Sequence, residues 1–467
     1  MSEWESVIGL EIHVQLKTRT KMFCACEVAY FDPPNTHTCP VCLAHPGALP
    51  VANARAIEET IKLGLALGCE IAPRALFHRK NYFYPDLPKG YQISQYDVPL
   101  CASGAFTVPE PDGDRQVGIT RAHLEEDAAK NVHVGGAGGR IGGAAHTNVD
   151  FNRGGTPLVE IVTEPDLRSA DEAKRFLQLL RQTIVELGIS DAEMEKGTLR
   201  VDANVSVRER GETEYRTRTE LKNMNSFNFI ARGIEAEIER QIGVWESGGT
   251  VVQQTFDFDA ASGRLTPRRA KEEADDYRYF PEPDLVPVEP PAELVERARG
   301  QVPELPGARL RRLEPELDFD LAEGLVTSGR DRLYARTPGD RRAVANVLMN
   351  ELAGAGVDPD EVDGEELAKV IEARASLPRP VFAEAIAKSG DAGFRAEPYL
   401  AEVAVSDADE LGPLIDRILQ ANPGQVDAYR GGKDGLLGFF VGQVMKETQG
   451  KADPKAVNEL LRERLRA

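Results

Sequence analysis

The chain has 467 residues, of which 41% are hydrophobic and 28% charged, and a chain of this length forms roughly two to four domains. The apolar fraction excludes wholesale disorder. The 56 basic and 76 acidic residues give a net charge of −20, which excludes a protein that coats nucleic acid over its whole surface. No apolar run approaches the roughly 20 residues that span a bilayer, and the acidic N-terminus shows no signal-peptide pattern, so we expect a cytoplasmic protein.

Composition divides the chain into three parts. Residues 1–292 mix strand and helix signals and are dense in glycine, proline and aromatic residues. From residue 293 onward alanine, leucine, glutamate and arginine dominate, and apolar residues repeat with helical spacing. A second helical unit begins near residue 405. We therefore expect an α+β domain over 1–292, an all-α domain over 293–404 and an all-α tail over 405–467.

Two helix starts can be placed from capping residues. Ser169 and Glu172 form a capping box, with the serine as the N-cap and the glutamate three residues into the helix. Near the C-terminus Asp453 precedes Pro454, which is the order of an N-cap residue and a proline at the first helical position. We expect helices to begin at these two points.

The first motif that can carry chemistry is the alternating segment 7–16. Side chains of a strand point alternately to its two faces, so Glu11 and His13 share the polar face, roughly 7 Å apart along the strand. Both side chains can bind one cation. The alternative is a half-exposed strand whose outer face is simply polar.

A second motif, residues 119–127, ends in three consecutive carboxylates, Glu125, Glu126 and Asp127. Hard oxygen ligands of this kind are the ones that Mg²⁺ requires. The alternative is a solvated turn, because acidic runs are common on protein surfaces. This segment by itself does not distinguish the two.

A third segment, residues 198–208, alternates strictly between apolar and polar side chains. Its polar face carries Arg200, Asp202, Asn204 and Ser206. This combination indicates the floor of a site for a polar ligand, with an ordinary solvent-facing strand as the alternative. Lys222 follows just before a predicted helix and adds a positive charge.

Aromatic and charged residues are interleaved in two further segments, 79–86 and 275–284. The first contains Lys80 and the second contains Arg278. A lysine ammonium can bind a phosphate as a point charge, so these segments indicate the wall of a ligand site. Packing of the aromatic rings in the core is the alternative.

Four of the six cysteines fall within nineteen residues: Cys24, Cys26, Cys39 and Cys42. Two close cysteine pairs are the usual ligands of a closed tetrahedral zinc site. Because all four ligands then come from the protein, no position is left for a substrate, and we expect a structural zinc. Cys69 and Cys101 stand alone and are expected to be buried.

The glycine-rich segment 135–143 is a candidate phosphate loop. It does not end in the Gly-Lys-Ser/Thr sequence that closes a Walker A loop. We therefore expect a flexible hairpin tip there.

In combination these motifs resemble the GatB/GatE family, which provides one subunit of the bacterial aspartyl/glutamyl-tRNA amidotransferases. The likeness spans the whole chain and depends on long, specific segments. They are residues 8–14, 79–86, 123–127, 152–162, 222–227, 275–284 and 438–446. The chain departs from the family pattern mainly at 135–143, which contains none of the candidate site residues.

The resemblance implies an N-terminal cradle domain related in fold to glutamine synthetase, followed by a helical domain and a tRNA-binding tail. It implies that ATP phosphorylates the side-chain carboxylate of Glu or Asp on a misacylated tRNA. Ammonia then displaces the phosphate to give Gln-tRNA(Gln) or Asn-tRNA(Asn). It also implies a heterotrimer with a small third subunit and an amidase subunit, which supplies the ammonia from glutamine.

Within this reaction we expect Glu11, His13 and Glu126 to share one Mg²⁺ at the ATP phosphates. Adjacent residues of a strand point to opposite faces, so Glu125 is kept as a catalytic residue and not as a metal ligand. Lys80 completes the catalytic set. The residues expected to contact the nucleotide are Lys80, Arg200, Asp202, Asn204, Ser206, Lys222 and Arg278.

The tail differs in charge from the rest of the chain. Residues 430–467 carry eight basic and five acidic side chains, within a chain of net charge −20. A local positive region on an acidic protein is suited to selective contact with phosphates. A solvated helical face is the alternative.

Two other functions fit parts of the sequence. An ATP-dependent amidoligase acting on a small metabolite would share the cradle, but it has no use for the helical extension and tail. A zinc-stabilised RNA-binding protein would share the cysteines, but the negative charge and the carboxylate motifs argue against it.

Overall fold

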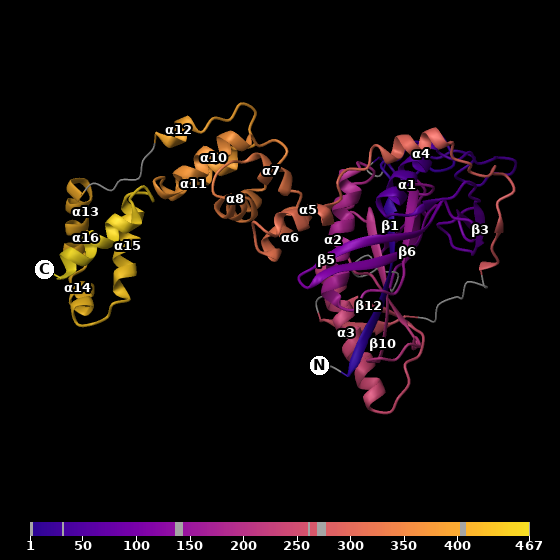
Figure 1. Cartoon of the computed structure of the whole chain (residues 1–467), viewed down its shortest axis with the longest axis horizontal. Coiled ribbons are helices and arrows are strands. Elements are labelled where there is room, and N and C mark those ends of the chain that lie inside the picture. Colours follow the sequence, from indigo (N-terminus) through magenta and orange to yellow (C-terminus); the bar gives the residue numbers. More distant parts are fainter. Residues whose placement is uncertain are drawn as a thin grey trace. The chain divides into compact units, whose positions relative to one another are not determined.

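The computed structural model describes residues 3–29, 32–135, 143–259, 262–268, 277–401 and 408–466. The chain divides into two compact units, Met1–Arg311 and Arg312–Ala467 (Figure 1). Three sequence predictions fall wholly or partly outside the described residues. They concern the glycine-rich hairpin tip at 135–143, the start of the 275–284 motif and the boundary between residues 404 and 405.

A nine-stranded sheet forms the centre of the first unit, in the spatial order β13-β12-β11-β10-β1-β9-β6-β5-β2. Its strands are β1 (Trp4–Gln15), β2 (Glu70–Ile71), β5 (Cys101–Glu110), β6 (Gly113–Glu126), β9 (Pro157–Thr163), β10 (Leu199–Glu209), β11 (Thr219–Lys222), β12 (Thr255–Asp259) and β13 (Arg264–Pro267). Neighbouring strands are antiparallel except for the parallel pair β11 and β12. The N-terminal strand β1 therefore lies inside the sheet, between β10 and β9.

The two faces of this sheet differ in polarity. On one face the apolar side chains of β1, including Leu10, Ile12 and Val14, are buried. Helices α1 (Ala54–Ala66), α2 (Ala170–Glu186) and α3 (Phe227–Glu246) pack on the strands, and Figure 1 shows α2 and α3 along one side of the sheet. Burying one such side chain stabilises the fold by about 1.5–3 kcal/mol. This apolar face fixes the direction in which the intervening polar residues point.

The start of α2 confirms the predicted N-cap. The Ser169 hydroxyl accepts a hydrogen bond from the backbone N–H of Glu172 at 3.1 Å. The Glu172 carboxylate bonds the backbone N–H of Arg168 and not that of the capping serine, at 2.6 Å. Two acidic residues in the first turn also suit the positive end of the helix dipole.

Two smaller sheets flank the central one. One has the order β14-β3-β4 and is formed by β3 (His78–Asn81), β4 (Tyr91–Ser94) and β14 (Phe280–Pro281). The guanidinium of Arg79 on β3 holds the buried Glu282 carboxylate with two hydrogen bonds of 2.7 Å. The other small sheet pairs β7 (Lys130–Val134) with β8 (His146–Asp150).

The first unit extends beyond the composition change at residue 293. It includes α4 (Ala292–Arg299) and most of α5 (Pro306–Leu313). Arg309 of α5 bonds Glu186 at the end of α2 at 2.9 Å, and Arg311 bonds Asp114 on β6 at 2.7 Å. These two ion pairs, the first buried and the second exposed, connect α5 to the sheet domain.

The second unit is helical, which confirms a sheet-rich domain followed by a helical region. Its helices are α6 (Phe319–Thr327), α7 (Asp331–Arg336), α8 (Arg341–Val347), α9 (Ala353–Ala355), α10 (Gly364–Glu372), α11 (Arg379–Lys388), α12 (Glu397–Leu400), α13 (Ala408–Ala421), α14 (Pro423–Arg430), α15 (Leu436–Glu447) and α16 (Pro454–Arg466), with a π-helical turn at Leu348–Leu352 and a 3₁₀ turn at Ala373–Ala375. Across the described ranges, no helix has the length and apolar character needed to cross a membrane.

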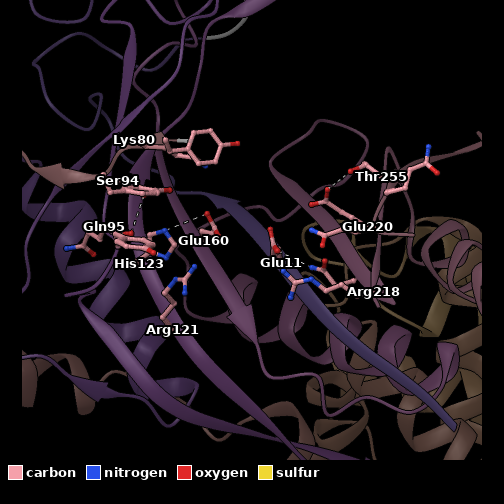
Figure 2. Close-up of a pocket in the computed structure, with 16 residues that line it drawn as sticks. Glu11, Lys80, Ser94, Gln95, Arg121, His123, Glu160, Arg218, Glu220 and Thr255 are labelled. Atoms are coloured by element: carbon pink, nitrogen blue, oxygen red, sulfur yellow. Dashed lines mark hydrogen bonds and ion pairs between the residues drawn. The ribbon is translucent and has the colours of Figure 1, made fainter. Parts of the chain in front are cut away.

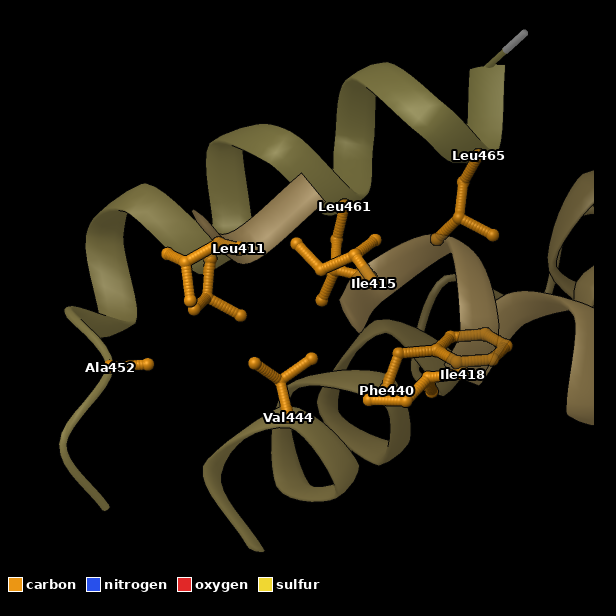
Figure 3. Close-up of a cluster of buried hydrophobic side chains, with 9 residues drawn as sticks. Leu411, Ile415, Ile418, Phe440, Val444, Ala452, Leu461 and Leu465 are labelled. Carbon is orange, nitrogen blue, oxygen red and sulfur yellow. The ribbon is translucent and has the colours of Figure 1, made fainter. Parts of the chain in front are cut away.

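The last four helices share a hydrophobic cluster (Figure 3). Ile415 of α13, Phe440 and Val444 of α15, and Leu461 of α16 are fully buried in it. The buried members of this cluster all lie between residues 411 and 465. The predicted start of α16 is confirmed, because the Asp453 carboxylate accepts hydrogen bonds from the N–H groups at 455 and 456.

Candidate active site

The register of four neighbouring strands aligns a row of ionisable side chains across the polar face of the central sheet. Arg200 on β10 lies opposite His13 on β1, His13 lies opposite Glu160 on β9, and Glu160 lies opposite His123 on β6. Residues paired across adjacent strands share a face and have their Cβ atoms about 5 Å apart. The row therefore gathers four charged or titratable groups from segments far apart in the sequence.

His13, Glu125 and Glu160 form a compact cluster within this row. The His13 Nε2 atom lies 3.6 Å from a Glu125 oxygen and 3.5 Å from a Glu160 oxygen. One ligand atom from each of the three residues lies within 4.8 Å of the other two. Two carboxylates and an imidazole converging in this way can bind a divalent cation.

Burial and mutual interaction shift the pKa values of this cluster. Burial lowers the pKa of His13, but the facing carboxylates of Glu160 and Glu125 outweigh it and raise that pKa to about 9. Burial, reinforced by Glu160, raises the pKa of Glu125 to about 7. Burial lowers the pKa of His123 to about 4, so its imidazole is neutral at pH 7. The proton of His13 balances the charge of only one of the two facing carboxylates, Glu125 and Glu160. A bound cation would relieve the repulsion between them.

A second carboxylate cluster lies further along the same face, where Glu11, Asp202 and Glu220 converge. Lys222 pairs with Asp202 and, at 3.3 Å, with Glu220. Asn204 donates a hydrogen bond of 3.0 Å to Glu11. Because Lys222 already supplies a counter-charge, this cluster depends less on a metal ion than the His13 cluster does.

Both clusters border one cavity of about 380 Å³ (Figure 2). In Figure 2, Lys80, Gln95, Arg121, His123 and Glu160 gather on one side, and Glu11, Arg218, Glu220 and Thr255 on the other. Tyrosine rings from two segments form a wall beside them: Tyr96 stacks on Tyr279 with ring centroids 4.2 Å apart, and the Lys80 ammonium lies 4.8 Å from the Tyr277 ring centroid. The cavity thus combines acidic, basic and aromatic surfaces suited to a large polar ligand.

The structure brings Glu11, His13, Lys80 and Asn204 to this face, but it does not bring Glu126 there. Glu126 accepts a hydrogen bond from the Ile93 N–H at 3.0 Å and pairs with Lys89. It borders a separate cavity of about 200 Å³ beside the cysteines. Glu125, one residue earlier on β6, therefore takes the place beside His13 that the sequence pattern predicted for Glu126.

Five of the seven expected nucleotide contacts do not border the 380 Å³ cavity: Arg200, Asp202, Ser206, Lys222 and Arg278. Ser206 borders a smaller cavity of about 170 Å³, which also touches Glu11. Arg200 pairs with the buried Asp127 at 3.0 Å. Arg278 is exposed and has a left-handed backbone conformation with φ of 46°. Asp202 and Lys222 pair with each other beside Glu220, which does border the cavity.

Sequence reasoning missed five residues of the site: Gln95, Arg121, His123, Glu160 and Glu220. Glu160 had a signal, because it is the one charged residue in the apolar run of β9, Pro157–Thr163. Arg121 lies within the 119–127 motif and Gln95 follows the 79–86 segment, but nothing in their spacing points to a ligand. Their position on the cavity depends on pairing between distant strands.

The four clustered cysteines converge as their spacing predicts. Ligand atoms of Cys24, Cys26, Cys39 and Cys42 all lie within 4.8 Å of one another. Sulfur–sulfur interaction with Cys24 lowers the pKa of Cys42 to about 4, helped by the nearby Lys21 ammonium. Interaction with Cys42 raises the pKa of Cys24, and burial raises that of Cys26 to about 11, so Cys42 is the thiolate of the metal-free set. Four converging cysteine sulfurs can bind a metal. Cys69 and Cys101 are buried, as expected for isolated cysteines.

Comparison with known proteins identifies the class of enzyme. Residues 6–296 match the GatB/GatE catalytic domain and residues 334–465 match the GatB domain. The chain is 48% identical to the GatB-type subunit of the aspartyl/glutamyl-tRNA(Asn/Gln) amidotransferase of Moorella thermoacetica, over 99% of this chain and 100% of that protein. It is 47% identical to the protein of the same name from Syntrophotalea carbinolica, over 99% of both chains.

These similarities define a component of a glutamine-dependent ligase that acts on tRNA. The chain belongs to the GatB family, whose members are subunits of the aspartyl/glutamyl-tRNA(Asn/Gln) amidotransferases. The resemblance found from the sequence motifs is thereby confirmed.

The pKa of His13 gives a test of this geometry. In metal-free protein, NMR titration of labelled histidine should place the His13 pKa near 9. That exceeds the value of about 6.5 in an unfolded chain, so the His13 proton stabilises the fold below about pH 6.5, and this contribution is lost as the pH rises through 9. Glu160→Gln should lower the His13 pKa because it removes a facing carboxylate. A His13 pKa near 6.5 in both proteins would contradict the arrangement.

Proposed function

We propose that this chain phosphorylates the side-chain carboxylate of Glu or Asp on misacylated tRNA with ATP, and then exchanges the phosphate for ammonia. The products are Gln-tRNA(Gln) or Asn-tRNA(Asn). The amidase subunit supplies the ammonia, the small third subunit completes the heterotrimer, and the complex works in the cytoplasm. Family membership supports the amidation of tRNA-bound amino acids. The cavity supports the phosphorylation step.

The observation that carries the phosphorylation step is the His13–Glu125–Glu160 cluster, whose Glu160 borders the same cavity as Lys80. A carboxylate resists attack by ammonia, and a phosphoryl group makes one of its oxygens a better leaving group. Phosphoryl transfer depends on positioning and on charge stabilisation more than on covalent catalysis. A Mg²⁺ held by these three side chains would neutralise phosphate oxygens and orient them for in-line transfer.

The remaining side chains have roles that follow from their charge and place. The Lys80 ammonium stays charged because Tyr279, Glu125 and Glu160 raise its pKa, although burial opposes them. It can therefore bind a phosphate oxygen. Asp202, Asn204 and Lys222, on the neighbouring strands, are proposed to line the nucleotide. The tyrosine wall limits the access of water. An acyl phosphate must be protected from water in this way if it is to survive until ammonia arrives.

The second candidate functions are less well supported. A small-metabolite amidoligase does not account for the match of residues 334–465 to a domain of the tRNA-dependent enzymes. A zinc-stabilised RNA-binding protein does not account for two convergent carboxylate clusters at one cavity. Amide formation on misacylated tRNA by the complete heterotrimer distinguishes all three.

Glu160 and Glu126 provide a direct test of the proposed metal site. In the complete complex, Glu160→Gln removes one of the side chains proposed to hold Mg²⁺. It should therefore lower the apparent Mg²⁺ affinity by about tenfold to 100-fold. The affinity is measured as ADP formation against Mg²⁺ concentration. Glu126→Gln should leave the Mg²⁺ dependence of ADP formation unchanged, since Glu126 faces the other cavity.

The two variants share the same chemical change, so a general effect of losing one carboxylate would appear in both. An unchanged Mg²⁺ dependence in Glu160→Gln, or a large shift confined to Glu126→Gln, would contradict the proposed metal site.

We propose further that the four-cysteine cluster holds a structural zinc. Cys39→Ser should reduce the bound zinc from about one ion per chain to a small fraction, and should lower the melting temperature, because metal binding and folding are coupled at such sites. Metal analysis and thermal unfolding measure the two effects. Cys69→Ala, which removes a cysteine outside the cluster, is the control and should retain the zinc. Full zinc content in Cys39→Ser would contradict the assignment.

The C-terminal helices are proposed to contact tRNA phosphates through the basic residues of 430–467. Deleting residues 408–467 removes their hydrophobic cluster as a whole. In the complete complex this deletion should raise the KM for misacylated tRNA and flatten its dependence on salt, because each lost phosphate contact reduces the log–log slope by about one. The glutaminase activity of the amidase partner without tRNA is the control. Unchanged tRNA affinity and salt slope would assign the tail a structural role.

A further inference from the structure

Arg121 is a half-buried arginine on β6 that borders the 380 Å³ cavity. Within the part of the chain that the structure describes, no carboxylate pairs with it, and its Nε atom is buried without a hydrogen bond. Its neighbours across the sheet are Ala102 on β5 and Val162 on β9, whose side chains offer no acceptor. The other arginines of β6 and β10 differ, since Arg115 pairs with a glutamate and Arg200 with an aspartate.

Gln95 borders the same side of the cavity (Figure 2). Its side-chain oxygen accepts two hydrogen bonds of 3.2 Å from the backbone N–H groups of Leu100 and Leu124. Of the two carboxamide atoms only the oxygen can accept hydrogen bonds from N–H donors, so these two bonds fix the orientation of the carboxamide. The Nε2 atom therefore points away from those two groups, and among the described residues it is buried without a hydrogen-bond partner. The side chain as a whole is 2% exposed.

Two sets of unused donors on one cavity wall require an explanation. A buried donor without an acceptor destabilises the fold, and a half-buried guanidinium without a counter-ion does so as well. The nearest acidic residue of the row, Glu160, already faces His13 and His123. A planar guanidinium beside an amide N–H₂ matches the oxygens of a carboxylate or a phosphoryl group.

We propose that Arg121 and Gln95 form a subsite for an anionic oxygen group of the substrates. The group is either the side-chain carboxylate of the aminoacyl residue or the phosphoryl group transferred to it. The subsite lies beside the His13–Glu125–Glu160 cluster, where the two groups react in the proposed function, and the inference depends on that function. Arg121 supplies the charge and the fork of donors, and Gln95 supplies a donor whose direction is fixed by the backbone.

The test is steady-state kinetics of the complete complex carrying Arg121→Gln. Because Arg121 has no ion-pair partner among the described residues, this change breaks no ion pair there and should not lower the melting temperature. We expect the KM for misacylated tRNA, or the KM for ATP, to rise by about tenfold or more, as for the loss of one charge-assisted contact. A rise in the KM for misacylated tRNA identifies the carboxylate as the ligand, and a rise in the KM for ATP identifies the phosphoryl group.

The matched control is Arg115→Gln on the same strand. Arg115 is exposed and borders none of the cavities near the site, so both KM values should stay at those of the unchanged protein. Arg121→Lys keeps the positive charge but loses the paired N–H donors of the guanidinium. It should therefore recover only part of the substrate affinity that Arg121→Gln loses.

A second variant tests Gln95 without disturbing the backbone. Gln95→Glu retains an oxygen for the N–H groups of Leu100 and Leu124 but replaces the N–H₂ donor with a negative oxygen. It should raise the same KM as Arg121→Gln. If both variants fold and both KM values are unchanged, the subsite is overturned. That outcome is distinct from failure of the proposed function, in which the unchanged complex itself would form no ADP or amide.

Discussion

The antiparallel register of β1 with β10 and β9 is the constraint on which the site depends. It sets His13 opposite both Arg200 and Glu160, and Glu11 opposite Asp202. A slip of one residue would turn these side chains toward the helices and the apolar residues toward the cavity. The buried apolar side chains of β1 therefore do more than stabilise the domain, because they hold the polar row in register.

Charge balance explains how so many ionisable groups are tolerated on one sheet face. Two unit charges 4 Å apart interact by about 4 kcal/mol at the effective dielectric of a protein surface, so unpaired carboxylates in a partly buried cluster are unfavourable. The Glu11–Asp202–Glu220 cluster contains its own cation in Lys222. In the His13–Glu125–Glu160 cluster, His13, whose pKa is about 9, is the only cationic group at ion-pair distance among the described residues, and Lys80 and Arg200 act from further away. This difference makes the His13 cluster the better site for a metal ion.

The features that could be predicted from the sequence are those set by short-range geometry. Strand alternation placed Glu11 and His13 on one face, a capping serine placed the start of α2, and cysteine spacing brought four sulfurs together. The choice between Glu125 and Glu126 could not be made in this way. It depends on the register of β6 against β9, which sets His123 opposite Glu160 and so puts Glu125, two residues further on, on the same face.

Long-range packing set the other features as well. Arg278 lies in a motif rich in charged and aromatic residues, yet its left-handed backbone leaves it exposed. Arg121 follows a register irregularity in the pairing of β6 with β9, after Ile119, which no local pattern reveals. The first unit ends within α5, at Arg311, because Arg309 and Arg311 bind the sheet domain, although composition changes earlier.

The most direct measurement of the central claim is anomalous X-ray diffraction from crystals of the complex soaked in Mn²⁺, an anomalous scatterer that can replace Mg²⁺. The account predicts an anomalous peak within bonding distance of His13 Nε2 and of carboxylate oxygens of Glu125 and Glu160. A peak beside Glu126, or an empty His13 cluster when Mn²⁺ supports full ADP formation, would contradict it.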